Sequence, residues 1–551
     1  MHDDQPGDVP RVSAGAGSGA AVPSLELDVD GRTVTVPDRG DTLLGVLRDE
    51  LGITGPKDGC SPQGQCGCCT VLVDGRPRVA CVTPARRVVG RPVTTIDGLD
   101  PDRRQAWADA FTAAGASQCG FCTPGIITRL DALAAGYEQS APPVSVDVEH
   151  TGVDKALLAH LCRCTGWQTI TEAWDLFRRG RAESTSGTAV TLASRNSDAA
   201  ARRAEIEGAA PQAVGSTVAL GQGGFAADSA PDNALVAVQD GDGWAVGETL
   251  AEARAAMGKV QGRRTTAHHQ WPLDVPAGPW DATLRTTWVE PAYLETDASW
   301  CAPGGEPFTT LANGGAFGAK RASPVAAAAR ELADRHGRSV LVLASREDVT
   351  RWGPKRPPVA GGATADGRGI LRVVSTPGIV EAVAAVAPGV SVEEITVPGP
   401  PTSAAIRAAG WAEASVLLAG ARGVTGPVTA PNGAVAEAEV SGTGIDVRVR
   451  CGEVLDEVVL RSYCIGAAHM AWSWVTNEAL TVDPDGTVHD LTIRSFGVAR
   501  AIDTPPIRVE IDRADSGPPI NGSDAVFAAV AAAVWLAGGT ESDWPTGYSL
   551  S

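Results

Sequence analysis

The stretch that most constrains the fold runs from Gly59 to Cys81 and reads GCSPQGQCGCCTVLVDGRPRVAC. Its loop is rich in glycine, which permits the positive φ angles and the close backbone approach needed to wrap an iron–sulfur cluster. Three cysteines on this loop and a fourth beyond the following hairpin are spaced as in proteins that bind such clusters. The four predicted ligands are Cys60, Cys66, Cys69 and Cys81.

A second group of cysteines lies in two short motifs, QCGFCTPG at 118–125 and LCRCTGW at 161–167. A threonine follows each cysteine pair, and we expect Thr123 and Thr165 to cap helices, the first with Pro124 in its first turn. Two helix N-termini would then face one anionic cluster and stabilise its charge. The predicted ligands of this cluster are Cys119, Cys122, Cys162 and Cys164.

Other uses of these cysteines stay open on the residues alone. A Cys-x-x-Cys together with a Cys-x-Cys could hold a structural zinc, and a Cys-x-x-Cys by itself could be a redox dithiol. Cys68 is a surplus thiol flanked by predicted ligands, and we interpret it as a small bystander that is buried or partly exposed. The cysteines predicted to be ordinary core residues are Cys301, Cys451 and Cys464.

The composition of the 551-residue chain argues against several classes of protein. Its 46 Lys and Arg against 65 Asp and Glu give a net charge of -19, so nucleic acid is not an expected partner. The longest apolar run, Ala525 to Ala537, is too short to cross a bilayer and predicts a buried helix. Residues 1–23 show no export signal, which predicts a disordered tail and a cytoplasmic protein with metal-binding or redox cysteines.

The first unit of the chain is predicted from two hairpins, at 25–36 and 71–79, which both turn at Asp-Gly. A helix is expected between them at 41–51, with Asp41 as its N-cap. These elements predict a β-rich domain over residues 24–99.

Helical periodicity follows over 100–182, and a polar stretch at 183–215 is predicted to be a linker that is helical in part. Short strands and Ala-rich helices alternate over 216–551, so the chain as a whole is assigned to the α+β class. The helices expected in the second unit span 103–114, 124–135, 153–160 and 169–179, with a loop at 138–148. In the third region we expect strands at 445–450 and 487–493 and a helix at 322–336.

Residues 25–180 resemble the iron–sulfur subunit of the molybdenum hydroxylases, the family of xanthine dehydrogenase, aldehyde oxidase and carbon monoxide dehydrogenase. The motifs QCGFCTPG and LCRCTGW are highly specific to that family. The resemblance implies a β-grasp, plant-type ferredoxin-like domain and then a four-helix iron–sulfur domain. It also implies that the first cysteine set holds an outer two-iron, two-sulfur (2Fe-2S) cluster and the second set the cluster nearer the molybdenum cofactor.

Within this resemblance Gln118 would approach the pterin of the cofactor. The loop of the first set departs from the family, because five residues separate Cys60 from Cys66 where four are usual. Cys68 also stands where the family commonly has alanine, so Cys68 could replace a neighbour as a ligand.

From about Val214 onward the chain resembles a shortened molybdopterin-binding subunit of the same family. NGGAFGAK at 313–320 resembles a loop that presents backbone to the metal centre, and PPTSAAIRAAGWAE puts Arg407 at the family's arginine position. The loop residues that this resemblance places around the cofactor are Gly315, Phe317 and Gly318.

Several parts of that subunit are missing. Val289 stands where the family has an active-site glutamine, and no Gly-Gln-Gly cofactor motif occurs between Gly423 and Arg448. Ser523 occupies the place of the general-base glutamate, and a serine cannot act as a base without help. Asp524, one position further on, is the residue that could substitute.

These features predict an electron-transfer subunit of a molybdenum hydroxylase complex, in which two 2Fe-2S clusters carry electrons from a molybdenum centre to a flavin or another acceptor. The molybdopterin cofactor and FAD are expected in separate partner chains, and the C-terminal region is expected to be a degenerate docking scaffold. One alternative is a self-contained minimal molybdenum hydroxylase that uses Arg407 and Asp524. Another is a noncatalytic assembly or redox-sensing protein.

Overall fold

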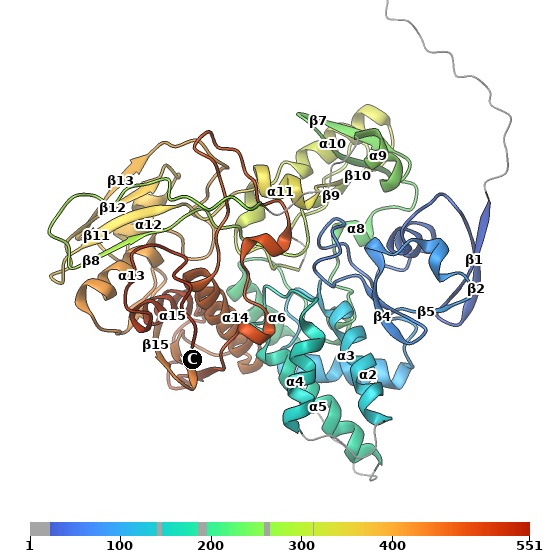
Figure 1. Ribbon diagram of the computed structural model, residues 1–551, viewed down its shortest axis with the longest axis horizontal. Coiled ribbons are helices and arrows are strands. Elements are labelled where there is room, and N and C mark those ends of the chain that lie inside the picture. The colour runs from blue at the N-terminus through green and yellow to red at the C-terminus, as the bar shows by residue number, and fades with distance from the viewer. Residues whose placement is uncertain (1–22, 140–145, 186–195, 258–264, 312, 551) are drawn as a thin grey trace, which may run out of the picture.

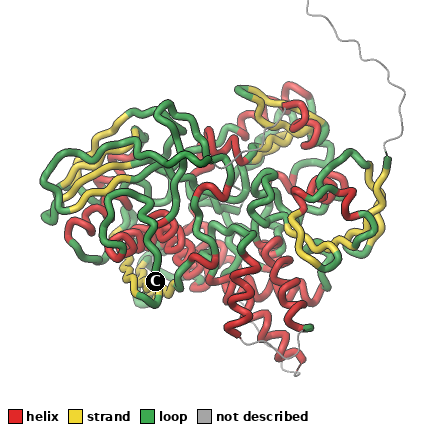
Figure 2. The backbone as a smooth tube through the Cα atoms, in the orientation of Figure 1, coloured by secondary structure: helices red, strands yellow, loops and turns green. Residues whose placement is uncertain are grey.

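The computed structural model describes residues 23–139, 146–185, 196–257, 265–311 and 313–550. The expected disordered tail lies outside these ranges apart from Pro23, and so does most of the loop expected at 138–148. Within the described ranges, no helix is long and apolar enough to cross a membrane. A sheet domain, a group of helices beside it and a larger mixed region follow one another along the chain (Figures 1 and 2).

The N-terminal domain is built on one five-stranded sheet. Both predicted hairpins are confirmed, and their Asp-Gly turns have the positive φ angles that tight hairpins favour, 52° and 73° at Asp30 and Gly31 and 51° and 69° at Asp74 and Gly75. The strand order is β2-β1-β5-β3-β4, with β1 parallel to β5. The strands are β1 (Ser24–Val29), β2 (Arg32–Pro37), β3 (Thr70–Val73), β4 (Arg76–Val79) and β5 (Pro92–Thr94).

The helix expected at 41–51 is irregular and capped by a different residue. One α-helical turn, α1 (Leu43–Gly45), continues as a π-helical segment, η1 (Val46–Glu50). Thr42 is the N-cap instead of Asp41, because the Thr42 hydroxyl accepts a hydrogen bond from the Gly45 amide at 3.2 Å.

Four helices follow, as expected, and Figure 1 shows them grouped beside the sheet domain. Trp107 of the first stacks on Phe177 of the last, with ring centroids 3.7 Å apart, which gives this unit an aromatic core. The third helix begins earlier than expected and ends before residue 160, so the chain leading into LCRCTGW is a loop. The helices are α2 (Pro101–Ala114), α3 (Thr123–Glu138), α4 (Val146–Leu157) and α5 (Gln168–Thr185).

The C-terminal region contains three four-stranded sheets in the part of the chain that the structure describes. Their strand orders are β7-β6-β10-β9, β13-β12-β11-β8 and β14-β15-β16-β17. The strands are β6 (Leu235–Asp240), β7 (Gly243–Gly247), β8 (Ala282–Arg285), β9 (Ala298–Cys301), β10 (Val340–Leu343), β11 (Val359–Ala363), β12 (Gly369–Val374), β13 (Val390–Ile395), β14 (Val428–Thr429), β15 (Val435–Ser441), β16 (Gly444–Arg450) and β17 (Ile507–Ile511).

Two long helices, α14 (Glu457–Thr476) and α15 (Ser523–Ala537), pack on each other in this region. The buried helix predicted from the apolar run is confirmed as α15. The other helices are α6 (Ser197–Gly208), α7 (Ser216–Ala219), α8 (Ala226–Ser229), α9 (Leu250–Met257), α10 (Val325–His336), α11 (Arg346–Trp352), α12 (Ile379–Ala384) and α13 (Trp411–Arg422). Short helical turns are η2 (Ala80–Val82), η3 (Ala85–Val88), η4 (Ala319–Ala322), η5 (Ile493–Phe496) and η6 (Ala501–Asp503).

The stretch expected as a linker, 183–215, is structured over much of its described part. α5 continues to Thr185, and helix α6 packs against α14. Arg203 and Glu207 of α6 are buried, with side-chain exposures of 0% each. This part of the stretch is therefore packed into the C-terminal region instead of crossing solvent.

The strand expected at 487–493 is wrong. Val488 makes only an isolated bridge with Val482, and Ile493 begins the short helix η5. The backbone there pairs with a side chain from the first cysteine loop, since Gln63 donates to the Leu491 carbonyl and accepts from the Ile493 amide. These contacts replace the ladder that a strand would need.

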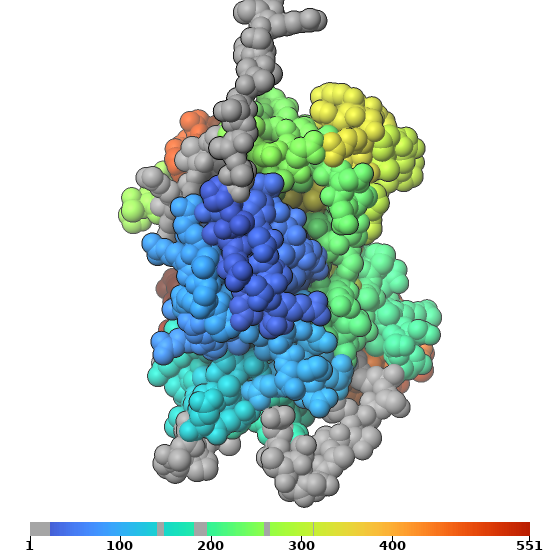
Figure 3. All heavy atoms as spheres, turned by 90° about the vertical axis from the view of Figure 1, so that its right-hand side faces the viewer, coloured from blue at the N-terminus to red at the C-terminus, as the bar shows by residue number. Residues whose placement is uncertain are grey.

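The N-terminal sheet domain and the helices beside it share one hydrophobic core with the C-terminal region. Trp288, Leu294, Ile493 and Phe496 belong to the same buried cluster as the side chains of the sheet domain. Figure 3, seen from the side of that domain, shows its blue surface running without a break into green segments of the later chain. The two parts are thus positioned against each other by packing.

Candidate functional site

The first cysteine set lies on the loop between η1 and β3, with its last member in η2 after β4. Its sulfurs are close neighbours: hydrogen bonds with Cys66 and Cys81 lower the pKa of the Cys60 thiol well below its ordinary value, and the pKa of Cys66 is raised. Backbone amides also point at sulfur, because Gln63 N lies 3.2 Å from Cys60 Sγ. All four predicted ligands are buried, with exposures of 1% or 2%.

The second set forms two sulfur pairs. The Sγ atoms of Cys119 and Cys164 are 3.6 Å apart, close to the roughly 3.7 Å between two thiolates bound tetrahedrally at about 2.3 Å. A hydrogen bond between the other two thiols lowers the pKa of Cys162 to about 6 and raises that of Cys122 well above its ordinary value. Two iron ions that each take a sulfur pair would fit this donor set.

Only one of the two expected helix N-termini lies beside this set. Cys122 itself is the N-cap of α3, and Thr123 is the first helical residue, so the predicted capping role of Thr123 is wrong. α5 begins at Gln168 and not directly after Thr165, because Gly166 and Trp167 take left-handed φ angles of 65° and 68°. The Thr165 hydroxyl instead lies 3.1 Å from Cys162 Sγ.

Cys68 is fully buried between the two sets. Its thiol hydrogen-bonds Cys66, which lowers its pKa, but burial and the nearby sulfurs of both sets leave that pKa raised. Cys162 of the second set is one of the sulfurs that raise the pKa of Cys68, and Cys68 in turn raises the pKa of Cys122. The role of Cys68 as a bystander or a replacement ligand stays a prediction.

No three His, Cys, Asp or Glu side chains within the described ranges are arranged to bind one metal ion. The three later cysteines are all buried, as predicted for core residues. Cys451 also accepts a hydrogen bond from Arg203 Nη2 at 2.8 Å.

The residues predicted around a molybdenum cofactor come together in the C-terminal region. Arg407 donates from Nε to Asp524 Oδ1 at 3.0 Å and from Nη2 to the Ser523 hydroxyl at 3.1 Å. Its guanidinium also lies over the Phe317 ring, 4.8 Å from the centroid. Burial raises the pKa of Asp524, and the neighbouring Arg407 lowers it by less, so the pKa is raised overall. The Asp524 side chain is 31% exposed.

Two further predicted residues lie at the junction with the second cysteine set. Gly315 has a φ of 83°, which favours glycine, and a Cβ there would lie 3.2 Å from Cys119 Sγ, so this loop lies close against the sulfurs. Gln118 Nε2 donates to the Cys164 carbonyl and to the Ser462 hydroxyl, both at 3.0 Å. The C-terminal region therefore contacts the second set directly.

Sequence reasoning missed the charged groups that hold the cysteine loops in place. Arg163, between two predicted ligands, makes a buried two-point contact with Glu478 at 2.5 and 2.7 Å. Arg346 Nη2 donates to the carbonyls of Gly59 and Leu294, both at 2.8 Å. An arginine inside a cysteine motif was the available signal, since a charge there needs a buried partner.

A model of the [2Fe-2S] binding domain family matches residues 95–175. The chain is 38% identical over 146 residues to a probable xanthine dehydrogenase subunit from Bacillus subtilis, a match that covers 26% of this chain and 79% of that protein. It is 38% identical over 150 residues to the nicotine 6-hydroxylase small subunit from Paenarthrobacter nicotinovorans, covering 27% and 86%. The match to the xanthine dehydrogenase of Drosophila subobscura, 36% identical, covers only 13% of that protein.

The similarity in fold extends much further than the similarity in sequence. The aldehyde oxidoreductase from Desulfovibrio gigas superposes with a TM-score of 0.67 and 15% identity, over 95% of this chain and 99% of that one. This match shows a shared α+β fold. Together with the sequence matches it establishes that the chain belongs to the molybdenum hydroxylase family of xanthine dehydrogenases and aldehyde oxidoreductases, as its motifs indicated.

Proposed function

We propose that this chain is the iron–sulfur electron-transfer component of a molybdenum hydroxylase complex. The observation that carries the proposal is the convergence of eight buried cysteines into two adjacent sets, joined by Cys68. Each set would hold one 2Fe-2S cluster, which supplies reversible one-electron transfer when bound. The chain would pass electrons from a molybdenum centre in a partner chain to a flavin or another acceptor.

The protein's own residues would keep the two clusters dry and rigidly spaced. Backbone amides of Gln63 and Cys81 point at ligand sulfurs, at 3.2 and 3.4 Å. Glu478 and Arg346 anchor the cysteine loops from the C-terminal region. Fixed, buried sites lower the structural rearrangement that accompanies each electron transfer, so the C-terminal region would serve as a scaffold.

The proposal includes two partners, one chain with the molybdopterin cofactor and one with FAD. Support comes from two similar proteins, which are named as a subunit of a xanthine dehydrogenase and as the small subunit of nicotine 6-hydroxylase. A cytoplasmic complex of this kind would contain substrate chemistry in the partner and electron carriers in this chain.

Isolation of the full chain from its own host tests this role. We expect a tagged chain to bring down a molybdopterin-containing protein, and substrate added to that complex to reduce both clusters, seen as two electron paramagnetic resonance (EPR) signals. A chain that carries its clusters but never retains a molybdopterin protein would contradict the role.

A self-contained minimal hydroxylase is the second candidate, favoured by the contact between Arg407 and Asp524. Asp524 would then act as the base, with its raised pKa closer to operating pH. This candidate requires a molybdenum ion in each isolated chain, whereas the electron-transfer role requires it only in the complex.

A further inference from the structure

The place where the family resemblance would put molybdopterin can be located from four predicted residues. Gln118 and Gly315 lie beside the second cysteine set, and Arg407 and Asp524 lie together at the start of α15. A cofactor in this chain would have to lie between these two pairs. The end of helix α6 and the residues that follow it lie there, because Glu207 lines a small cavity with Arg407 and Asp524, and Gln212 lines another with Gln118.

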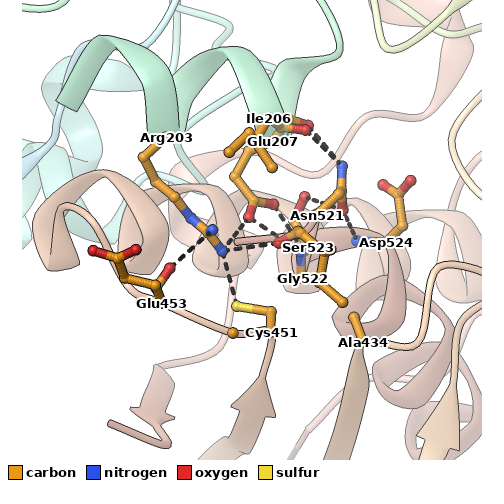
Figure 4. Close-up of polar contacts among 12 residues, drawn as sticks. Arg203, Ile206, Glu207, Ala434, Cys451, Glu453, Asn521, Gly522, Ser523 and Asp524 are labelled. Atoms are coloured by element: carbon orange, nitrogen blue, oxygen red, sulfur yellow. Dashed lines mark hydrogen bonds and ion pairs between the residues drawn. The ribbon is translucent and has the colours of Figure 1, made fainter. Parts of the chain in front are cut away.

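α6 is attached to the start of α15 through Glu207, which also forms a buried ion pair with Arg203 on the same helix. Arg203 and Glu207 face each other at 2.9 Å, both with 0% exposure. The Glu207 carboxylate accepts hydrogen bonds from the backbone amides of Gly522 and Ser523 at 3.1 and 2.9 Å. Figure 4 shows this carboxylate pointing at the N-terminal turn of α15, with Arg203 reaching across towards Cys451. An anion-binding helix terminus is therefore already filled by the chain's own carboxylate.

The segment after α6 covers the glycine loop. A Cβ on Gly314 would collide with the amide nitrogen of Gln212, so the two are in close contact. The Ala213 amide donates to Asn313 Oδ1 at 2.7 Å, and Asn313 in turn donates to the Cys119 carbonyl at 2.7 Å. The loop that would present its backbone to a metal centre instead presents it to this segment.

The space that remains is too small for the cofactor. The cavity lined by Glu207, Phe317, Arg407 and Asp524 has a volume of about 50 Å³, and the one lined by Gln118, Gln212 and Tyr463 about 20 Å³. Sites for ligands of cofactor size usually offer about 300 Å³ or more. These two cavities suit one or two water molecules each.

The charges at this place also disagree with an anionic, phosphate-bearing cofactor. Arg203 is paired with Glu207 and Arg407 with Asp524, so each of these cations already has a carboxylate partner. Both members of the first pair lie on α6, so moving α6 aside would carry the pair into water and would take the Glu207 carboxylate away from the Gly522 and Ser523 amides, which would lose their partner. The residues present therefore do not fit molybdopterin.

We infer that α6 and the residues up to Gln212 close the molybdopterin position from within the chain, so that this polypeptide holds no molybdenum cofactor. The inference deepens the proposed electron-transfer role, on which it rests in part. It identifies α6 as the element that leaves the C-terminal region a scaffold without a cofactor.

The metal and pterin content of the full chain tests the inference directly. The protein would be produced in a host that makes molybdopterin, next to a molybdopterin enzyme produced in the same cells as a loading control. We expect about four iron atoms per chain, two for each cluster, but less than about one twentieth of a pterin or molybdenum per chain. One pterin per chain would overturn the closure.

In this experiment the iron content tests the electron-transfer role, and the pterin content tests the closure by α6. A chain without clusters and without pterin would end the electron-transfer role but agree with the closure. A chain with both would keep the clusters and end the closure.

Hydrogen–deuterium exchange of the wild-type chain gives a second measurement that needs no variant. Amides of residues 199–208 should exchange as slowly as those of α14, and adding purified molybdopterin should leave both unchanged. Faster exchange in α6 together with pterin that stays bound through gel filtration would show that the helix is a movable lid, and would overturn the inference.

Discussion

The iron–sulfur third and the region after it differ in how they retain cofactor-binding residues. The first keeps every predicted thiol ligand, buried and paired with another sulfur. The second also brings its predicted residues together, since Arg407 meets Asp524 and Gly315 reaches Cys119, but its own helix α6 lies between them. A shared fold and correctly placed residues thus do not amount to a binding site when the space is filled.

The largest expected effect comes from removing a ligand of the second set. Cys119→Ser replaces one sulfur of the Cys119–Cys164 pair, so we expect about half of the iron and one of two EPR signals to disappear. The matched control is Cys301→Ser, which changes a buried cysteine on β9 away from both sets and should keep all iron. Equal iron in both variants would contradict the assignment.

The closure by α6 predicts a large difference between two Arg–Glu pairs with the same spacing on a helix. Arg203 and Glu207 are 0% exposed, whereas Arg335 and Glu331 are 61% and 68% exposed. Glu207→Gln leaves a buried arginine without its counterion and should lower the free energy of unfolding by about 3–5 kcal/mol. Glu331→Gln should cost less than about 0.5 kcal/mol.

Urea denaturation, followed by tryptophan fluorescence, measures both variants. If Glu207→Gln unfolds at the same urea concentration as Glu331→Gln, α6 is not held as described and the C-terminal region is more open than its contacts indicate.

A buried histidine on α14 predicts acid sensitivity in the region that contacts the second set. His469 is fully buried, with Nε2 3.1 Å from the Ala499 carbonyl oxygen, and burial lowers its pKa to about 4. The unfolded chain takes up this proton near pH 6.5. Because the unfolded chain binds this proton at a higher pH than the folded protein does, the free energy of unfolding is highest above pH 6.5. It falls by about 3 kcal/mol as the pH falls towards 4.

His469→Gln should flatten this part of the dependence of unfolding free energy on pH between 7 and 4. The control is His336→Gln, at the exposed end of α10, which should keep the wild-type slope. A slope that is the same in all three proteins would show that His469 does not carry the effect.

The smallest expected effect belongs to Cys68. As a bystander between the sets, it can be replaced by serine with iron content and both EPR signals unchanged to within about a tenth. Loss of one signal in Cys68→Ser would make it a ligand and would redefine the first set. The same measurement on Cys66→Ser, a predicted ligand, provides the contrast.

Local signals predicted the iron–sulfur part well. Asp-Gly turns fixed both hairpins, and short cysteine spacings marked two sets whose sulfurs the structure brings together. The strand expected at 487–493 failed because its backbone pairs with Gln63, more than four hundred residues earlier in the chain. Thr165 failed as a helix cap because Gly166 and Trp167 turn left-handed before α5 begins.

The closure of the C-terminal site could not be predicted for a related reason. The sequence places Arg203 and Glu207 four residues apart in a polar stretch, where such a pair is usually exposed. Their burial depends on Cys451, Gly522 and Ser523, which come from distant segments. Only these tertiary contacts show that part of the stretch expected as a linker fills the site.

Iron analysis combined with an EPR-monitored reductive titration of the isolated full chain tests the central claim most directly. We expect about four iron atoms per chain and two distinguishable signals, each accounting for about one electron. Both signals should also appear when substrate reduces the intact complex. A chain that binds zinc in place of iron, or that shows a single signal of one electron, would contradict the two-cluster electron path.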